Sequence, residues 1–150
     1  MRAVIQRVSE ASVFVQDEKV ANIQQGLLIF LGIEIEDSKE DTGWLVNKIS
    51  ALRIFSDSEG KMNNSILDVD GDVIVVSQFT LHAKTKKGNR PSYIKSARPE
   101  QAIPFYEQFK NELSEVIGKQ VQSGEFGADM KVHLVNDGPV TIIIDSKNKE

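Results

Sequence analysis

The sequence GLLIFLG at residues 26–32 is an unbroken apolar run bounded by two glycines. A run with no polar face is typical of a β-strand that is buried on both sides in the middle of a sheet. A second run, VIVVSQF at residues 73–79, is rich in β-branched residues and predicts another central strand. These two runs predict the centre of a sheet.

Shorter runs of strand-forming residues lie toward both ends of the chain. At the start they cover residues 2–8, 12–16 and 19–23, with Asp17-Glu18 as the expected hairpin turn. Near the end, residues 130–136 alternate between apolar and polar, and residues 140–145 form a last strand. The Asp-Gly between these two is a common hairpin signal, so we expect a tight turn there.

Two segments have helical patterns. The first runs from Ser38 to Leu52, with Ser38 as N-cap and acidic residues in the first turn, where the helix dipole favours them. The second ends near Gly118 and begins at either Pro99 or Pro104, a choice that the pattern leaves open. We therefore expect a single α+β domain over residues 1–150, with a curled antiparallel or mixed, barrel-like sheet and two main helices on one side.

Composition narrows the class of protein. The chain has 150 residues, 40% of them hydrophobic and 27% charged, which is normal for one globular domain. It has no cysteine, so disulfides and cysteine nucleophiles are excluded. The longest apolar stretch is far below the ~20 residues of a membrane span, and the first residues do not resemble a secretory signal. We expect a soluble, cytoplasmic protein with no membrane partner.

Charge is distributed unevenly along the chain. Six of the 18 basic residues and none of the 22 acidic residues lie in residues 84–98, so this segment carries +6. The remaining residues, with 12 basic and 22 acidic side chains, carry −10. Such a contrast favours a local anionic ligand, although a solvated lysine-rich loop would have the same pattern.

The common catalytic motifs are missing. His82 and His133 are the only histidines, and neither has a metal-ligand partner at a recognised spacing. His133 is expected on the surface, whereas His82 follows the end of a strand. No phosphate-binding glycine loop or Gly-x-Ser-x-Gly is present. We expect no metal and no cofactor, while a Ser-His-Asp triad assembled in space stays open.

Two polar segments are candidates for a site. In SQFTL at residues 77–81, three polar side chains interrupt an apolar run at the end of a strand, where ligand contacts are common. A locally satisfied strand end would have the same pattern. The second segment is NDGPVT at residues 136–141, which alone indicates only a hairpin. From local sequence its Gly138–Pro139 bond is expected to be trans.

Together these two segments resemble the signature motifs of the D-aminoacyl-tRNA deacylase family. They lie about 55 residues apart, as in that family. MRAVIQRVSEASV resembles the family's opening strand, KKGNRPSY its basic loop, and FGADMKVHLVNDGPVT its C-terminal hairpin. The resemblance covers essentially the whole chain.

The resemblance implies an activity and an assembly. Family members hydrolyse the ester between a D-amino acid and the 3′ end of tRNA, and they clear glycine mischarged onto alanine tRNA. They are homodimers whose site forms where SQFTL of one subunit meets a cis Gly-Pro of the other, here Gly138–Pro139. That dipeptide would occupy the space that an L side chain needs, with Arg7 supporting it and Asn136 and Thr141 beside it.

The resemblance also implies a mechanism in which the RNA 2′-OH helps to activate water. Ser77, Gln78, Phe79 and Thr80 would then bind the adenosine and the aminoacyl group, and backbone N–H groups could stabilise the oxyanion. The RNA phosphates would contact four basic residues, Lys84, Lys86, Lys87 and Arg90.

Three alternatives remain at this point. In the first, Thr80 is a covalent nucleophile in the same reaction, which would require an adjacent base. In the second, the protein is an esterase for small esters, with Ser77 or Thr80 attacking. In the third, it is a tRNA-binding module without activity.

Overall fold

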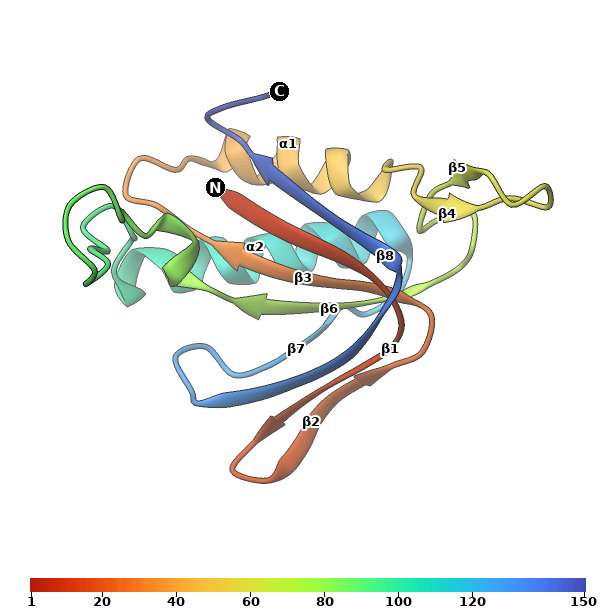
Figure 1. Cartoon of the computed structure of the whole chain (residues 1–150), viewed down its shortest axis with the longest axis horizontal. Coiled ribbons are helices and arrows are strands. Elements are labelled where there is room, and N and C mark those ends of the chain that lie inside the picture. Colours follow the sequence, from red (N-terminus) through yellow and green to blue (C-terminus); the bar gives the residue numbers. More distant parts are fainter.

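A computed structural model describes all residues, 1–150. Along the chain the elements are β1 (Arg2–Val15), β2 (Glu18–Ile23), β3 (Gly26–Gly32), α1 (Lys39–Ser50), β4 (Phe55–Ser56), β5 (Met62–Asn64), β6 (Asp72–Ser77), the 3₁₀ helix η1 (Phe79–His82), α2 (Pro99–Ile117), β7 (Gln122–Ser123) and β8 (Met130–Asp145). Figure 1 shows the two α-helices side by side on one face of the sheet. Neither helix is long and apolar enough to span a membrane.

The main sheet is mixed and strongly curled. Its order is β2-β1-β3-β6-β7, and β8 pairs with β1 along the other edge. The first half of β1 pairs with β3 and the second half with β2, so the sheet bends at the middle of β1. At the far seam, the Gln122 side chain exchanges hydrogen bonds of 2.8 and 2.9 Å with the backbone of Asn22, which links β7 to β2. The predicted barrel-like α+β fold is confirmed.

Two apolar cores explain why the central strands have no polar face. Alternate residues of β3 and β6, such as Ile29 and Val75, pack in the large core between the sheet and the helices. The residues between them, such as Leu28 and Ile74, pack in a smaller core inside the curl of the sheet. Since successive side chains of a strand point to opposite faces, each of these strands contributes to both cores.

Helix boundaries follow from local chemistry. At the start of α1, the Asp41 carboxylate accepts hydrogen bonds from the Ser38 backbone N–H at 2.9 Å and from its hydroxyl at 3.0 Å. Helix α2 begins at Pro99 and includes Pro104. Proline has no backbone N–H, which costs little in the first turn because an N–H there would have no helical partner. The question that the pattern left open is thus decided in favour of the earlier start.

The N-terminal hairpin differs from the sequence prediction in two ways. Residues 2–8 and 12–16 are not separate strands, because β1 continues through both. The turn lies at Gln16-Asp17 and not at Asp17-Glu18, and both turn residues have positive φ angles, 50° and 65°. Positive φ at both central residues suits the right-handed twist of a two-residue hairpin.

The predicted C-terminal hairpin is wrong, because β8 runs without reversal from Met130 to Asp145. Both of its halves pair with the same long partner, β1. Gln6 lies opposite Thr141 and Val8 opposite Asn136, so four residues of β8 face the single residue Arg7. The Asp-Gly-Pro segment is therefore a bulge within a continuous strand. An Asp-Gly signal is local, and a partner strand long enough for both halves overrides it.

Candidate active site

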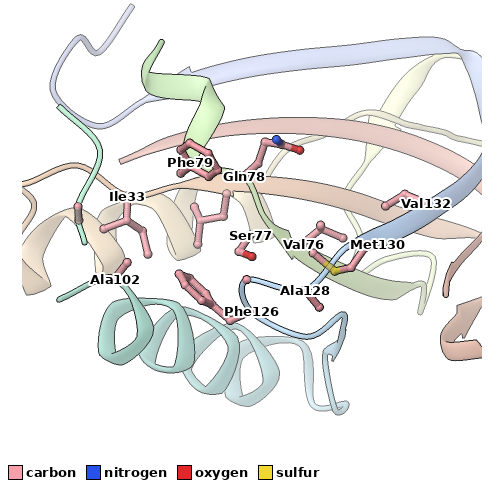
Figure 2. A pocket seen from close by; sticks show the side chains of 13 residues that line it. Ile33, Val76, Ser77, Gln78, Phe79, Ala102, Phe126, Ala128, Met130 and Val132 are labelled. Atoms are coloured by element: carbon pink, nitrogen blue, oxygen red, sulfur yellow. The ribbon is translucent and has the colours of Figure 1, made fainter. Parts of the chain in front are cut away.

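A cavity of about 260 Å³ lies at the carboxyl end of β6. Three sections of chain surround it: the ends of β3 and β6, the first turn of α2, and the loop that leads into β8. Figure 2 shows Ser77 beside Phe126 and Ala128 of that loop, with Ile33 and Ala102 on the other side. Ten of the 13 lining residues are hydrophobic, so the cavity is an apolar space with a few polar groups at one end.

The SQFTL segment reaches the cavity because the parallel ladder continues past β6. The Gln78 N–H donates to the Leu31 carbonyl at 2.8 Å, and η1 then turns the chain away. This turn packs closely on β3 at Gly32, where a Cβ would lie 2.9 Å from the Gln78 carbonyl oxygen. A larger residue at position 32 would push the segment out of place.

The polar side chains of this segment have different partners. Ser77 lines the cavity and is half-buried. The Gln78 amide donates to the Thr80 hydroxyl oxygen at 2.5 Å. The contact that holds the Thr80 hydroxyl is therefore an amide N–H, which cannot accept its proton. Phe79 also lines the cavity, but 55% of it is exposed at the rim.

The second signature segment forms the bulge of β8, and Arg7 lies beneath it. The guanidinium donates to the Asp137 carbonyl at 2.9 Å and to the Ile54 carbonyl at 2.6 Å. Arg7 is only 9% exposed, so it is not the surface arginine that its strand position alone would suggest. The Gly138–Pro139 bond is cis, contrary to the local expectation. Gly138 has φ 143°, and a Cβ there would lie 2.8 Å from a Val140 methyl carbon.

Two further side chains brace the base of the bulge. Asn136 accepts from the Val140 N–H at 2.8 Å and donates to the Thr141 hydroxyl at 2.9 Å. Thr141 also accepts from the Gln6 amide at 3.1 Å across the β1–β8 ladder. Asp137, Gly138 and Pro139 themselves are exposed. The bulge is thus a braced projection of backbone.

Within one chain the two signature segments are not brought together. The cavity is lined by Ser77, Gln78 and Phe79 but by no residue of the bulge. Figure 1 places the bulge at the kink of β8, away from the end of β6. The separation has a direct consequence, since any site that uses both segments requires two copies of the chain.

The remaining sequence candidates lie around these segments. His133 is exposed, as predicted, and meets Phe14 edge to face. His82 is buried with its Nδ1 4.0 Å from a Glu34 carboxylate oxygen, and its Nε2 has no hydrogen-bond partner. The four basic candidates are exposed in the loop between η1 and α2: Lys84, Lys86, Lys87 and Arg90.

Sequence reasoning named only three of the 13 residues that line the cavity, and the residues that it missed include Phe126 and Met130. Phe126 lies in an irregular segment, where no periodic pattern indicates burial. Met130 fits the alternation of its strand, which predicts a face but not what that face encloses.

Comparisons with known proteins identify the family of the chain. A family model for D-Tyr-tRNA(Tyr) deacylase matches residues 4–145. Proteins named D-aminoacyl-tRNA deacylase from Flavobacterium johnsoniae and Bacteroides fragilis are each 63% identical over 150 residues, with both chains fully covered.

Solved structures resemble the whole fold. One described as "c-Myc DNA Unwinding Element Binding Protein" has a TM-score of 0.92 at 41% identity, covering 97% of this chain and 98% of its own. Another, of a probable eukaryotic D-amino acid tRNA deacylase, has a TM-score of 0.77 at 17% identity, covering 95% and 97%, and shows the fold alone. On the match of the family model to residues 4–145 and the full-length match of these curated relatives, the chain belongs to the D-Tyr-tRNA(Tyr) deacylase family.

Proposed function

We propose that this protein hydrolyses the ester between a D-amino acid and the 3′ end of tRNA, releasing free tRNA and the D-amino acid. The observation that carries this proposal is the cavity at the end of β6, which holds the signature residues Ser77, Gln78 and Phe79 and adjoins an acid-free basic segment. Relatives that share 63% of its residues over their full length are named D-aminoacyl-tRNA deacylases. The expected compartment is the cytoplasm.

The cavity receives the aminoacyl end of the substrate. Its volume of about 260 Å³ is just below the ~300–1,000 Å³ of small-molecule sites, so it suits an amino acid better than a whole nucleotide. Ser77 and backbone N–H groups near it orient the ester, while Gln78, Phe79 and Thr80 contact the terminal adenosine. The negative charge that develops on the carbonyl oxygen when water adds would be stabilised by such fixed donors.

Selection against L-amino acids comes from a second copy of the chain. In the proposed homodimer, Gly138 and Pro139 of the partner subunit project over the cavity and occupy the space that an L side chain needs. Support comes from the exposure of this bulge and from its bracing by Arg7 and Asn136. A braced backbone rejects the L form by steric clash with its side chain, without contacting the side chain of the D form. Glycine has no side chain, so glycyl-tRNA(Ala) is a further substrate.

The RNA itself supplies the group that activates water. In the proposed step, water adds to the ester carbonyl carbon, the bond to the ribose 3′ oxygen breaks, and that oxygen receives a proton. The 2′-OH beside this bond relays the proton, because the Thr80 hydroxyl is held by an amide and not by a base. The protein contributes orientation, which alone can lower a barrier by several kcal/mol.

Matched substrates test this proposal. We expect rapid deacylation of D-tyrosyl-tRNA and glycyl-tRNA(Ala) and no deacylation of L-tyrosyl-tRNA above the spontaneous rate. Equal rates on the D and L forms would refute the selection by the Gly-Pro bulge. Hydrolysis of a small D-amino-acid ester without any nucleoside would instead identify an esterase with Ser77 or Thr80 as nucleophile, and tight RNA binding without hydrolysis would identify a binding module.

A further inference from the structure

Two exposed aromatic rings lie together beside the cavity. Phe79, on the cavity rim, and Tyr93 meet edge to face, with ring centroids 5.0 Å apart and planes at 73°. Phe79 is 55% exposed and Tyr93 37% exposed. Much of this aromatic surface is therefore in contact with water, although each ring would be favourable to bury.

The backbone holds Tyr93 in this position. Its neighbour Ser92 exchanges two hydrogen bonds, of 2.8 and 3.0 Å, with the backbone of Lys84. On the other side, the Ser96 N–H donates to the Tyr93 carbonyl at 2.9 Å, and the Ser96 hydroxyl donates to the Phe79 carbonyl at 2.9 Å. Because Ser96 ties both ring-bearing segments together, the pair is arranged before any ligand arrives.

The chain segment that carries Tyr93 is positively charged. Residues 84–98 contain no acidic residue, and every basic side chain among them is exposed and forms no ion pair: Lys84, Lys86, Lys87, Arg90, Lys95 and Arg98. Four of these six lie on the loop that the Lys84–Ser92 bridge closes, directly before Tyr93. An anionic chain that leaves the cavity over Phe79 would thus pass Tyr93 on its way to this loop.

Exposed aromatic faces next to free cations are the features that bind unpaired nucleotides. Bases stack on such rings, while the cations follow the phosphate backbone. We propose that Tyr93, held against Phe79, is the stacking platform for the unpaired base that precedes the terminal adenosine of the substrate RNA. This inference rests on the proposed function and adds a binding subsite outside the cavity.

The test compares substrates that carry one nucleotide, three nucleotides or the whole tRNA. The D-tyrosyl group is placed on adenosine alone, on the trinucleotide CCA and on whole tRNA. We expect Tyr93→Ala to raise KM for the trinucleotide and for tRNA by about 5- to 150-fold, which corresponds to the loss of one stacked base. KM for aminoacyl-adenosine stays unchanged, since that substrate has no preceding base. Tyr93→Phe keeps the ring and is expected to behave as the unaltered protein does.

A neighbouring residue provides the matched control. Ile94 is 72% exposed, more than Tyr93, and is not aromatic, so Ile94→Ala removes exposed apolar surface next to Tyr93 without removing a ring. We expect it to leave all three KM values unchanged. The proposal would be overturned if Ile94→Ala raised KM as much as Tyr93→Ala does. It would also be overturned if Tyr93→Ala raised KM for aminoacyl-adenosine.

A binding experiment does not depend on the chemical step. Uncharged CCA carrying 2-aminopurine in place of the middle base should lose fluorescence on binding to the unaltered protein and to Tyr93→Phe, but not to Tyr93→Ala. If the unaltered protein quenches this probe yet deacylates nothing, the stacking subsite stands and the proposed function fails. Unchanged quenching by Tyr93→Ala, or a shift of that variant from dimer to monomer in sedimentation, would show instead that the ring serves another contact.

Discussion

The two signature segments of this protein are built in opposite ways. SQFTL lies at the end of a central strand and takes its position from the sheet, through the Gln78–Leu31 backbone bond and the close contact at Gly32. The bulge around Gly138 has no strand partner opposite it and takes its position from side chains, chiefly Arg7 and Asn136. One segment forms a cavity and the other a projection, and the proposed site, which uses both segments, therefore requires a second chain.

The largest expected effect is on the rate of deacylation, and it tests what the SQFTL segment contributes to the chemical step. If the SQFTL segment orients the ester and the RNA activates water, a D-aminoacyl-tRNA ending in 2′-deoxyadenosine should react ~10²–10⁴-fold more slowly. Thr80→Ala should retain substantial activity on the normal substrate. Single-turnover deacylation measures both rates.

The opposite pattern would identify Thr80 as a nucleophile. In that case the alanine variant is inactive, and the deoxy substrate still forms and releases an acyl-enzyme. A deoxy substrate that reacts at the normal rate would contradict activation by the 2′-OH.

The next largest effect is expected from loss of the support beneath the bulge around Gly138. Arg7→Ala leaves the Asp137 and Ile54 carbonyls without their charged donor, and we expect the free energy of unfolding to fall by about 1.5–3 kcal/mol for each such bond that water does not replace. The bulge should lose its fixed position, so the ratio of D to L deacylation falls. Denaturant unfolding and paired D- and L-tyrosyl-tRNA assays measure these changes.

Arg53→Ala is the matched control for this variant. Arg53 also donates to a backbone carbonyl, that of Asn63, but it is exposed and forms no hydrogen bond with the bulge. We expect little change in either measurement. A D to L ratio that Arg7→Ala leaves intact would show that the bulge holds its shape without this support.

A smaller effect is expected from the basic loop, which neither segment includes. Replacing Lys84, Lys86, Lys87 and Arg90 with alanine should weaken tRNA binding and flatten its dependence on salt. The slope of log K against log salt should decrease by ~0.7–0.9 for each phosphate that the loop no longer neutralises. Removal of three exposed lysines elsewhere, Lys19, Lys48 and Lys131, is the control. An unchanged slope in the loop variant would show that the loop is only a solvated surface.

The smallest expected effect is a decrease in the free energy of unfolding at low pH. It should come from Asp41, which lies in neither signature segment. Burial opposes ionisation of Asp41, but hydrogen bonds from Lys147, Ser146 and Ser38 outweigh it and hold its pKa well below the usual range. A lowered folded-state pKa stabilises the protein above the unfolded-state value near 3.8, and that contribution is lost as pH falls below it. Urea midpoints measured from pH 6 down to pH 3 should therefore decrease, and Asp41→Asn should show a weaker decrease. An identical decrease in that variant would assign the acid sensitivity to other groups.

Several features followed from the sequence alone, because local patterns report burial and helix ends directly. The runs at residues 26–32 and 73–79 have no polar face, and both strands do contribute to two cores. Ser38 and the acidic first turn placed the start of α1, since capping depends on residues within one turn. The two motifs and their spacing identified the family before any geometry was known.

Other features were decided only by the tertiary structure, because they depend on which segments find each other. Residues 130–145 carry an Asp-Gly turn signal, yet they stay one strand because β1 is long enough to pair with both halves. Phe126 and Met130 became cavity residues only when the loop before β8 and the start of β8 crossed the end of β6. The separation of the cavity from the Gly138–Pro139 bulge arises in the same way. Local sequence determines the face that a residue presents, but strand pairing determines what that face meets.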